Sequence, residues 1–293
     1  METAQHHFES IVIPSEQLYL LRSGEVVPED GVFIRAHLHT QHEIMWFRRA
    51  SGSYSINNQN FEIGDDTLVY VAPLVLHDMQ LTATSDHQRF LFQYDQALLN
   101  DLGVLTREGR KCPSVVMHLQ PADAERLQML FTWMAELRTG GDPLINEVMR
   151  LILQFMHELL SREEGIPDSI GAESAASKIL SVVRHMEKTR AYSMSLEEAA
   201  SSCRLSRSQF AKVFKSVMDM TYTEYLLSRK ISHAQHLLTR TDLSITEIAY
   251  ACEFTDSAYF CHKFRVVVGV SPRTFRTHQR TTQQLSSQHD VKS

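Results

Sequence analysis

Hydrophobic and polar residues follow two different periods along this chain of 293 residues. Between residues 10 and about 110, short segments alternate apolar and polar side chains, and turn-forming residues such as Asn57-Asn58 separate them at intervals of about 8–12 residues. A period of two with regular turns is typical of a small all-β sandwich or barrel. From Pro121 onward the apolar residues recur with the period of a helix, which predicts a change from strands to helices.

Two helices are predicted directly after the β-rich region. The first starts at Pro121 and stops at Gly140-Gly141, and the second starts at Asp142-Pro143, a pair typical of a helix N-terminus. Apolar residues cover more of the second helix than a single packing face needs. One face is expected to cover the β-rich region. The remaining apolar residues either pack within the same chain or meet a partner subunit in a homodimer.

The predicted fold class is α+β, with two domains. Gly, Pro, Ser and acidic residues are concentrated between the domains, which is typical of a linker. The predicted parts are a β-barrel at about 10–110 and a helical hairpin at about 121–162 within a first domain 1–165, a linker at 166–174, an all-α domain at 175–280 and a disordered tail at 281–293.

One sequence in the helical half occurs twice. In each copy a Ser-x-x-Glu capping box opens a short helix, and a turn without glycine leads to a second helix. In the first copy a further capping box, Ser206-x-x-Gln209, opens that second helix. Each copy is therefore predicted to be a helix-turn-helix, whose second helix enters the major groove of DNA. The 18 residues from Glu224 to Thr241 should form one helix that connects the copies. The matching positions are Ser195/Ser244, Glu198/Glu247, Ala200/Ala249, Cys203/Cys252, Phe210/Phe260 and Phe214/Phe264.

The two predicted recognition helices present different outward faces. Arg and Lys side chains of the first face can reach guanine edges or phosphates, whereas the second face is smaller and less basic. We therefore expect the first copy to read bases and the second chiefly to hold the register. The predicted DNA contacts are Arg207, Ser208, Ala211, Lys212 and Lys215 in the first copy, and Ser257, Ala258, Cys261, His262 and Arg265 in the second.

Charge is divided unevenly between the two halves. Residues 175–293 carry 17 Lys or Arg against 10 Asp or Glu, whereas residues 1–174 carry 12 against 25. The net charge of -6 thus combines a basic C-terminal half with an acidic N-terminal half. This division is typical of a regulatory domain attached to a DNA-binding domain. It makes a purely architectural DNA binder a weaker interpretation, because such a protein would not need an acidic β-rich domain.

The last third of the chain resembles the DNA-binding domain of AraC/XylS transcription regulators. In that family both recognition helices enter successive major-groove segments on one face of the DNA. The resemblance implies a transcription regulator with a small-molecule effector in its N-terminal barrel, and contact with RNA polymerase if it is an activator. The protein is expected in the cytoplasm, because the sequence shows no apolar run of the length of a membrane span. The runs that carry the resemblance are Leu196 to Ala200, Phe210 to Lys215, Arg229 with Ala234 and Leu237-Leu238, Ser244 to Ala249, Tyr259-Phe260, and Gly269 to Pro272 with Phe275-Arg276.

Three residues depart from the family pattern. Asp219 stands where the first copy usually has glycine, and aspartate tolerates the left-handed backbone that such a turn needs. Glu253 replaces a glycine in the second turn, which is therefore expected to be more strained. His262 stands where the family usually has arginine, so the second copy should bind DNA less tightly.

A second motif lies in the acidic half. The spacing Gly31-x5-His37-x-His39-x3-Glu43, followed by Pro73-x3-His77, resembles the paired motifs of cupin barrels. Imidazoles and a carboxylate on neighbouring strands can hold a divalent first-row metal. The first domain is thus expected to be cupin-like, with His37, His39, Glu43 and His77 either binding metal or retained as a motif without it.

The same motif marks the predicted effector site. The residues expected nearest the effector are Arg35, His37, His39, Glu43, Trp46 and His77. The layout is most similar to family members that regulate sugar and glycoside use. Trp46 then either stacks on a sugar ring or belongs to the core. His42 has no partner in the motif and is expected at the surface.

The function predicted from the sequence is sequence-specific DNA binding by a regulator, more specifically an activator that responds to a small molecule such as a sugar. The alternative is a metal-dependent cupin enzyme fused to a DNA-binding domain, but no catalytic residues are assigned and an enzyme is not expected. No run of about 18 apolar residues indicates a membrane span.

Overall fold

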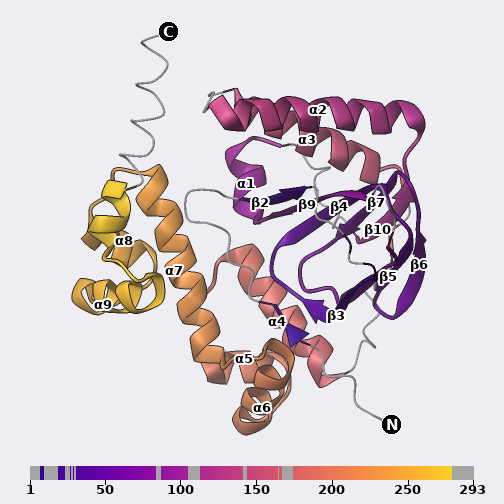
Figure 1. The fold of residues 1–293 in the computed structure, drawn as a ribbon. Coiled ribbons are helices and arrows are strands. Elements are labelled where there is room, and N and C mark those ends of the chain that lie inside the picture. Colours follow the sequence, from indigo (N-terminus) through magenta and orange to yellow (C-terminus); the bar gives the residue numbers. More distant parts are fainter. Residues whose placement is uncertain are drawn as a thin grey trace, which may run out of the picture. The chain divides into compact units, whose positions relative to one another are not determined.

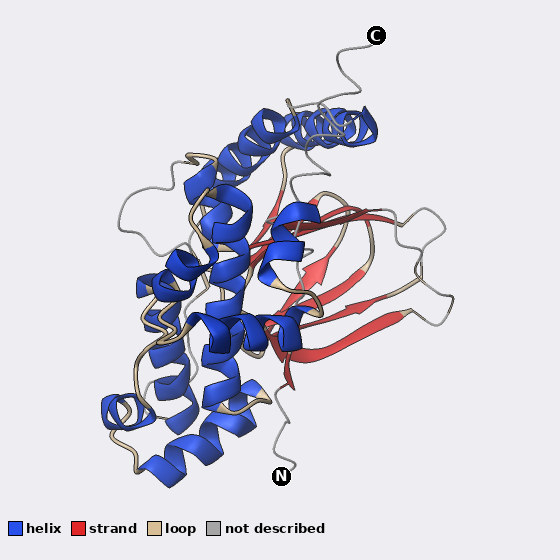
Figure 2. Cartoon of the chain, turned by 90° about the vertical axis from the view of Figure 1, so that its left-hand side faces the viewer, coloured by secondary structure: helices blue, strands red, loops and turns tan. Residues whose placement is uncertain are grey.

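The computed structural model describes residues 7–9, 19–23, 27, 29, 31–83, 87–104, 113–140, 144–163, 165–166 and 174–278. The chain divides into two compact units, Met1–Ala172 and Glu173–Ser293 (Figure 1). The strands belong to the first unit, and the described part of the second is helical (Figure 2). The predicted α+β fold class is therefore confirmed. Most of the predicted linker 166–174 and the whole predicted tail 281–293 lie outside the described residues.

The described part of the N-terminal unit contains two five-stranded sheets. All described strand pairs are antiparallel except β1 with β3. The first sheet has the order β1 (His7–Phe8), β3 (Val32–Leu38), β8 (His77–Leu81), β5 (Gly52–Ile56) and β6 (Gln59–Ile63). The second has the order β10 (Val115–His118), β7 (Thr67–Val71), β4 (His42–Arg49), β9 (Gln88–Tyr94) and β2 (Tyr19–Ser23).

Alternation along β4 explains how the two sheets pack. Met45 and Phe47 face the first sheet in a core that also contains Tyr54 and Met79. Ile44 and Trp46 point to the opposite side, as successive strand residues must. The inner core thus lies between the sheets, and the second sheet has a second buried face.

Helices cover that second face. Both α2 (Pro121–Gly140) and α3 (Ile145–Leu160) contribute to one core with β4, β7 and β9 (Figure 1). The predicted ends of the first helix are confirmed. The predicted start of the second at Asp142-Pro143 lies outside the described residues. The short elements α1 (Gln96–Asp101) and β10 were not predicted, because four to six residues show too little periodicity.

Turn chemistry fixes the strand register at two places. Ile56 pairs with Gln59, and the two residues between them, Asn57 and Asn58, both have positive φ angles of 51° and 65°. Asparagine tolerates this left-handed backbone, which a two-residue hairpin requires. Gly31 precedes β3 at φ 83°, where a Cβ would lie 2.5 Å from the Leu81 carbonyl oxygen. Only glycine fits there without a shift of the backbone.

The described part of the C-terminal unit contains helices α4 to α9, and residues 272–278 are helical as well. Capping boxes at Ser195, Ser206 and Ser244 are confirmed, and Thr221 forms one that was not predicted. Each satisfies two backbone donors that a helix start leaves unpaired. The helices are α4 (Ala175–Thr189), α5 (Leu196–Ser202), α6 (Arg207–Met218), α7 (Tyr222–Arg240), α8 (Ile245–Ala251) and α9 (Ser257–Val268).

Left-handed residues end helices and form turns in both copies. Asp219 ends α6 at φ 52°, as predicted for a residue in place of glycine. Arg204 at φ 54° and Glu253 at φ 60° occupy equivalent positions in the two helix-turn-helix turns. A side chain at positive φ is unfavourable compared with glycine, so both turns carry some strain. None of the described helices is long and apolar enough to cross a membrane.

Candidate DNA interface and effector site

Helix α6 is positioned by its apolar face. Phe210 and Phe214 are fully buried, and their rings contact Tyr222 at the start of α7. The side chains predicted to meet DNA lie on the opposite face, since residues three and four apart share one side of a helix. All five of them are exposed: Arg207, Ser208, Ala211, Lys212 and Lys215.

One cation of this face is engaged within the unit. The guanidinium of Arg207 lies 2.7 Å from a carboxylate oxygen of Glu197 on α5, and both side chains are well exposed. An exposed ion pair contributes little to stability, so the guanidinium can exchange this carboxylate for a phosphate or a base. Lys212 and Lys215 are exposed farther along the same face.

Helix α9 has the same construction but a weaker outward face. Phe260 and Phe264 are fully buried, and Asp256 caps the helix by accepting from the backbone N–H groups of Ala258 and Tyr259. Ala258, His262 and Arg265 are exposed, as expected. Ser257 and Cys261 are only partly exposed, and Cys261 packs against the apolar core of this copy. Its thiol is thus less available to DNA than the sequence suggested.

A buried polar cluster fixes the first copy to the connecting helix. The hydroxyls of Tyr192 and Tyr225 both donate to the carboxylate of Glu187, at 3.1 and 2.6 Å. Arg229 of α7 lies 2.7 Å from the same carboxylate. Burial raises the pKa of Tyr192 to about 12, so its hydroxyl stays protonated as a donor. The prediction that one helix connects the copies is confirmed. This helix, α7, has 19 residues and spans about 28 Å.

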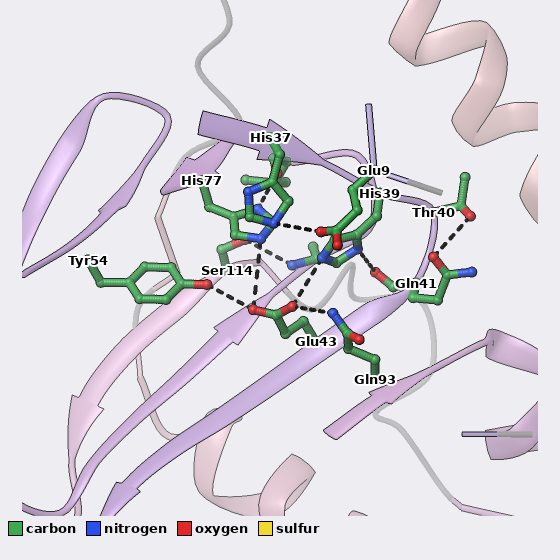
Figure 3. Close-up of polar contacts among 12 residues, drawn as sticks. Glu9, His37, His39, Thr40, Gln41, Glu43, Tyr54, His77, Gln93 and Ser114 are labelled. Carbon is green, nitrogen blue, oxygen red and sulfur yellow. Dashed lines mark hydrogen bonds and ion pairs between the residues drawn. The ribbon is translucent and has the colours of Figure 1, made fainter. Parts of the chain in front are cut away.

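The second candidate site lies between the sheets of the N-terminal unit (Figure 3). His37, His39 and His77 are buried, and each can offer a ligand atom within 4.8 Å of those of the other two. Glu43 joins them, with its Oε2 3.1 Å from His39 Nε2. His39 lies just beyond β3 and Glu43 lies on β4, so the carboxylate arrives from the next strand and not by alternation along one strand.

Backbone carbonyl groups fix the orientation of all three imidazoles. The Nδ1 atoms of His37, His39 and His77 lie 2.8, 3.0 and 2.9 Å from the carbonyl oxygens of Arg35, Gln41 and Val75. A carbonyl oxygen only accepts, so Nδ1 carries the proton and the Nε2 atoms turn toward the centre. Metal-binding histidines commonly use this arrangement.

The charges within the cluster also suit a cation. Burial lowers the pKa of His77 to about 3, so its ring is neutral near pH 7. Its Nε2 has no hydrogen-bond partner among the described residues and lies 3.8 Å from Glu43 Oε1. Burial alone would raise the pKa of Glu43, but its contact with His39 and the nearby imidazoles outweigh burial and lower that pKa. A negative carboxylate therefore faces a free imidazole lone pair.

Further polar residues surround Glu43. The hydroxyl of Tyr54 donates to Glu43 Oε1 at 2.9 Å, and the amide of Gln93 donates to Oε2 at 2.7 Å (Figure 3). Burial and the carboxylate raise the pKa of Tyr54 well above its usual value, so the phenol keeps its proton. Glu9 directly follows β1, and its carboxylate lies 3.2 Å from His37 Nε2. None of these three was found from the sequence, because none belongs to the motif and only the fold brings them to the cluster.

Two of the predicted effector residues lie elsewhere. Trp46 points to the other side of the second sheet, where its ring lies beside Phe90 and Phe131 in the core beneath α2, and those two rings also stack on each other. Of the two interpretations of Trp46, the one that assigns it to the core is therefore correct, and its ring cannot stack on a ligand beside Glu43. Arg35 is exposed on β3 and contributes its carbonyl group to the site.

The expectation that His42 lies at the surface is wrong. It occupies β4 beside Glu43 but faces α3, as its position in a strand requires. Its Nδ1 lies 2.8 Å from the Tyr70 hydroxyl, and its ring stacks on Tyr94, whose hydroxyl lies 3.0 Å from His157 on α3. Burial lowers the pKa of His42 to about 3 and that of His157 to about 4. This neutral polar cluster connects the outer face of β4 to α3.

Comparisons with known proteins cover the two units unequally. A family profile described as a helix-turn-helix domain matches residues 199–278, which include both copies' recognition helices. The HTH-type transcriptional activator RhaS of Escherichia coli strain K12 is 27% identical over 251 residues, covering 82% of this chain and 86% of RhaS. This match therefore extends well into the N-terminal unit.

The matches to solved structures are weaker. ToxT from Vibrio cholerae O395 covers 89% of this chain and 97% of its own, with 13% identity and a TM-score of 0.43. A transcriptional regulator from Chromobacterium violaceum, described as containing an AraC-type DNA-binding domain, covers 35% of this chain and 91% of its own. Its identity is 26% and its TM-score is 0.33.

Proposed function

We propose that this chain is a DNA-binding transcription regulator of the AraC/XylS family, in which α6 reads the base sequence while α9 mainly holds the second segment of the duplex. The observation that carries this assignment is the exposed face of α6, where Arg207, Lys212 and Lys215 stand opposite two buried phenylalanines. Arginine and lysine on such a face can contact guanine O6 and N7 in the major groove. The smaller face of α9 supports fewer base contacts.

A binding titration with the full chain tests this proposal. The probe is duplex DNA selected by the wild-type chain from a random-sequence library. We expect a complex whose affinity falls steeply with salt, because lysine and arginine displace condensed counterions from the phosphates. Lys212→Ala should weaken binding far more than Lys188→Ala, a control that removes one exposed charge from α4. Failure of the wild-type chain to bind DNA at low salt would overturn the proposal.

We further propose that the protein is an activator. The relative RhaS is named as a transcriptional activator, and it matches most of both chains. Activation requires contact with RNA polymerase, so polymerase is a proposed partner. Transcription from a template carrying the selected DNA upstream of a promoter should rise with added protein. A fall in transcription would make the protein a repressor.

A homodimer is a further part of the proposal. The helices of the N-terminal unit leave large apolar side chains exposed, namely Met129 and Trp133 on α2 and Leu151 on α3. Exposed apolar side chains on neighbouring helices commonly mark a contact surface between subunits. Light scattering should give twice the chain mass, and Trp133→Glu should return it to the mass of one chain.

We propose that the effector site is the His/Glu cluster between the sheets. Its polar groups are His37, His39, Glu43, Tyr54, His77 and Gln93. A few polar groups in an otherwise apolar barrel are the usual composition of a small-molecule site. Sugars and glycosides are the first candidates for the ligand. Thermal-shift screening of the full chain should find a ligand whose effect disappears in Tyr54→Phe, a variant that keeps the ring and loses the donor.

A divalent first-row metal ion is a second candidate occupant of the same cluster. The unpartnered Nε2 of His77, together with His37, His39 and Glu43, supplies nitrogen and oxygen ligands of the kind that such ions take. The ion would anchor an effector through an oxygen atom. Metal analysis of the purified protein should give one ion per chain, and His77→Gln should lower both this content and the melting temperature gained on adding Zn²⁺ or Mn²⁺.

Metal-free protein with no thermal response would leave the cluster as a retained motif without metal. The enzyme alternative has less support, because the matched relative is a regulator. It would require turnover of a small substrate that depends on the bound metal.

A further inference from the structure

Glu253 occupies the turn of the second helix-turn-helix at an unfavourable backbone angle. Its φ is 60°, a region that glycine adopts without cost and that glutamate does not. The family pattern has glycine here. A residue that keeps a side chain at such a position needs a compensating interaction, and the side chain of Glu253 makes two.

The first interaction is with the connecting helix. The ammonium group of Lys230, in the middle of α7, donates to the Glu253 backbone carbonyl at 3.0 Å and lies 3.7 Å from its carboxylate. The same ammonium group lies over the ring of Phe254, 5.7 Å from its centre. Lys230 is 17% exposed, so these contacts are partly shielded from solvent. They hold the second turn against α7.

The second interaction crosses to the first copy. The hydroxyl of Ser193 donates to Glu253 Oε1 at 3.0 Å, although the two residues are 60 positions apart. Ser193 lies in the loop between α4 and α5, next to Tyr192, whose hydroxyl is anchored on Glu187. The contact of Tyr192 with Glu187 thus holds this loop in place beside the first copy. Glu253 connects the turn of the second copy to the loop.

This connection matters because of how the helices pack. Among the described residues, the main contacts between helices fall into two groups. One group contains the four helices from α4 to α7, the other contains the three helices from α7 to α9, and only α7 belongs to both. A single shared helix permits one copy to rotate or bend relative to the other. One base pair of DNA corresponds to a rise of about 3.4 Å and about a tenth of a turn. Small rotations between the copies therefore change which half-site spacing fits.

We propose that Glu253 sets the half-site spacing: by joining Lys230 and Ser193 it fixes the separation and angle between α6 and α9. Glu253 is a positioning residue that does not itself contact DNA. This inference rests on the proposed DNA reading by the two copies and adds what determines their geometry.

The matched control is in the first copy. Arg204 occupies the equivalent turn position at φ 54°, and its side chain is exposed. Glycine at either position relieves the same backbone strain, but only Glu253→Gly removes the contacts of the carboxylate. Arg204→Gly also removes a positive charge, so it is expected to lower affinity about equally for every spacing.

The experiment measures the binding of the full chain to a series of duplexes. The DNA selected by the wild-type chain is footprinted, and one or two base pairs are inserted or deleted between the two protected segments. For the wild type and for Arg204→Gly, we expect each change to weaken binding by about tenfold or more, the usual cost of losing a specific contact set. For Glu253→Gly, we expect a loss of about threefold or less at the same duplexes, with weaker binding to the original DNA.

Ser193→Ala provides a second test that leaves the turn itself unchanged. It removes only the hydroxyl donor and should flatten the spacing profile in the same direction as Glu253→Gly. If both variants keep the tenfold penalty of the wild type, the proposal is overturned while DNA binding stands. If the wild type shows no binding to any duplex, the proposed function fails first.

Discussion

In both helix-turn-helix copies a Ser–Glu capping box opens the short helix, a left-handed residue forms the turn, and two fully buried phenylalanines anchor the second helix. The outward faces nevertheless differ. Arg207 and Lys212 of α6 correspond to Ser257 and His262 of α9. The residues that build the scaffold and the residues proposed to read DNA therefore lie on separate faces and can vary independently.

The largest expected effect concerns the scaffold, where the copies should be equal. Phe214→Ala and Phe264→Ala each remove a fully buried ring and should each destabilise the C-terminal unit by about 3–5 kcal/mol. Urea unfolding followed by far-ultraviolet circular dichroism measures this loss.

The chain itself supplies a control for that experiment. Both of its tryptophans, Trp46 and Trp133, lie in the N-terminal unit, so their fluorescence follows that unit separately. The fluorescence transition should stay unchanged in both variants. A loss below about 1 kcal/mol for Phe264→Ala alone would mean that the second copy is not packed as tightly as the first.

A smaller effect concerns the caps. Ser195 and Ser244 each accept from a backbone N–H three residues later, at 3.2 Å in both copies. Replacing either serine with alanine leaves that donor without its partner and should cost about 1 kcal/mol. Ser201→Ala, an exposed position outside the cap, is the control. Unequal losses at the two caps would contradict the equality of the scaffolds.

The smallest expected effect concerns the reading face of the first copy. Glu197→Gln removes the partner of Arg207, and an exposed ion pair contributes about 0–1 kcal/mol. The freed guanidinium should increase DNA affinity by less than about tenfold. Asp219→Asn removes the same charge from the same copy without touching Arg207 and should have less effect. Equal gains in the two variants would mean that only net charge matters.

Features with a local cause could be predicted from the sequence. The capping boxes depend on two residues three positions apart, and the strands depend on alternation between neighbours, so both are visible in short windows. The left-handed turn at Asp219 was predicted for the same reason. The exposed face of α6, with Arg207, Lys212 and Lys215, could be predicted from helical spacing alone.

Features that depend on packing could not be predicted in this way. Alternation places His42 and Trp46 on one face of β4 and Glu43 on the other, but it does not tell which face meets the helices and which meets the second sheet. Glu9, Tyr54 and Gln93 reach the cluster only through the fold. The strain at Glu253 was predicted, whereas its partner 60 residues away was not.

The two copies are proposed to have different roles: the first reads bases and the second holds the register. The most direct measurement compares Lys212→Ala with His262→Ala on the selected duplex and on its single-base substitutions. Lys212→Ala should lose about 1–3 kcal/mol of discrimination at the base pairs beneath α6. His262→Ala should lower affinity for all sequences about equally and leave discrimination within about 0.5 kcal/mol of the wild type. If His262→Ala loses as much discrimination between base sequences as Lys212→Ala, the proposed difference in role between the two copies is wrong.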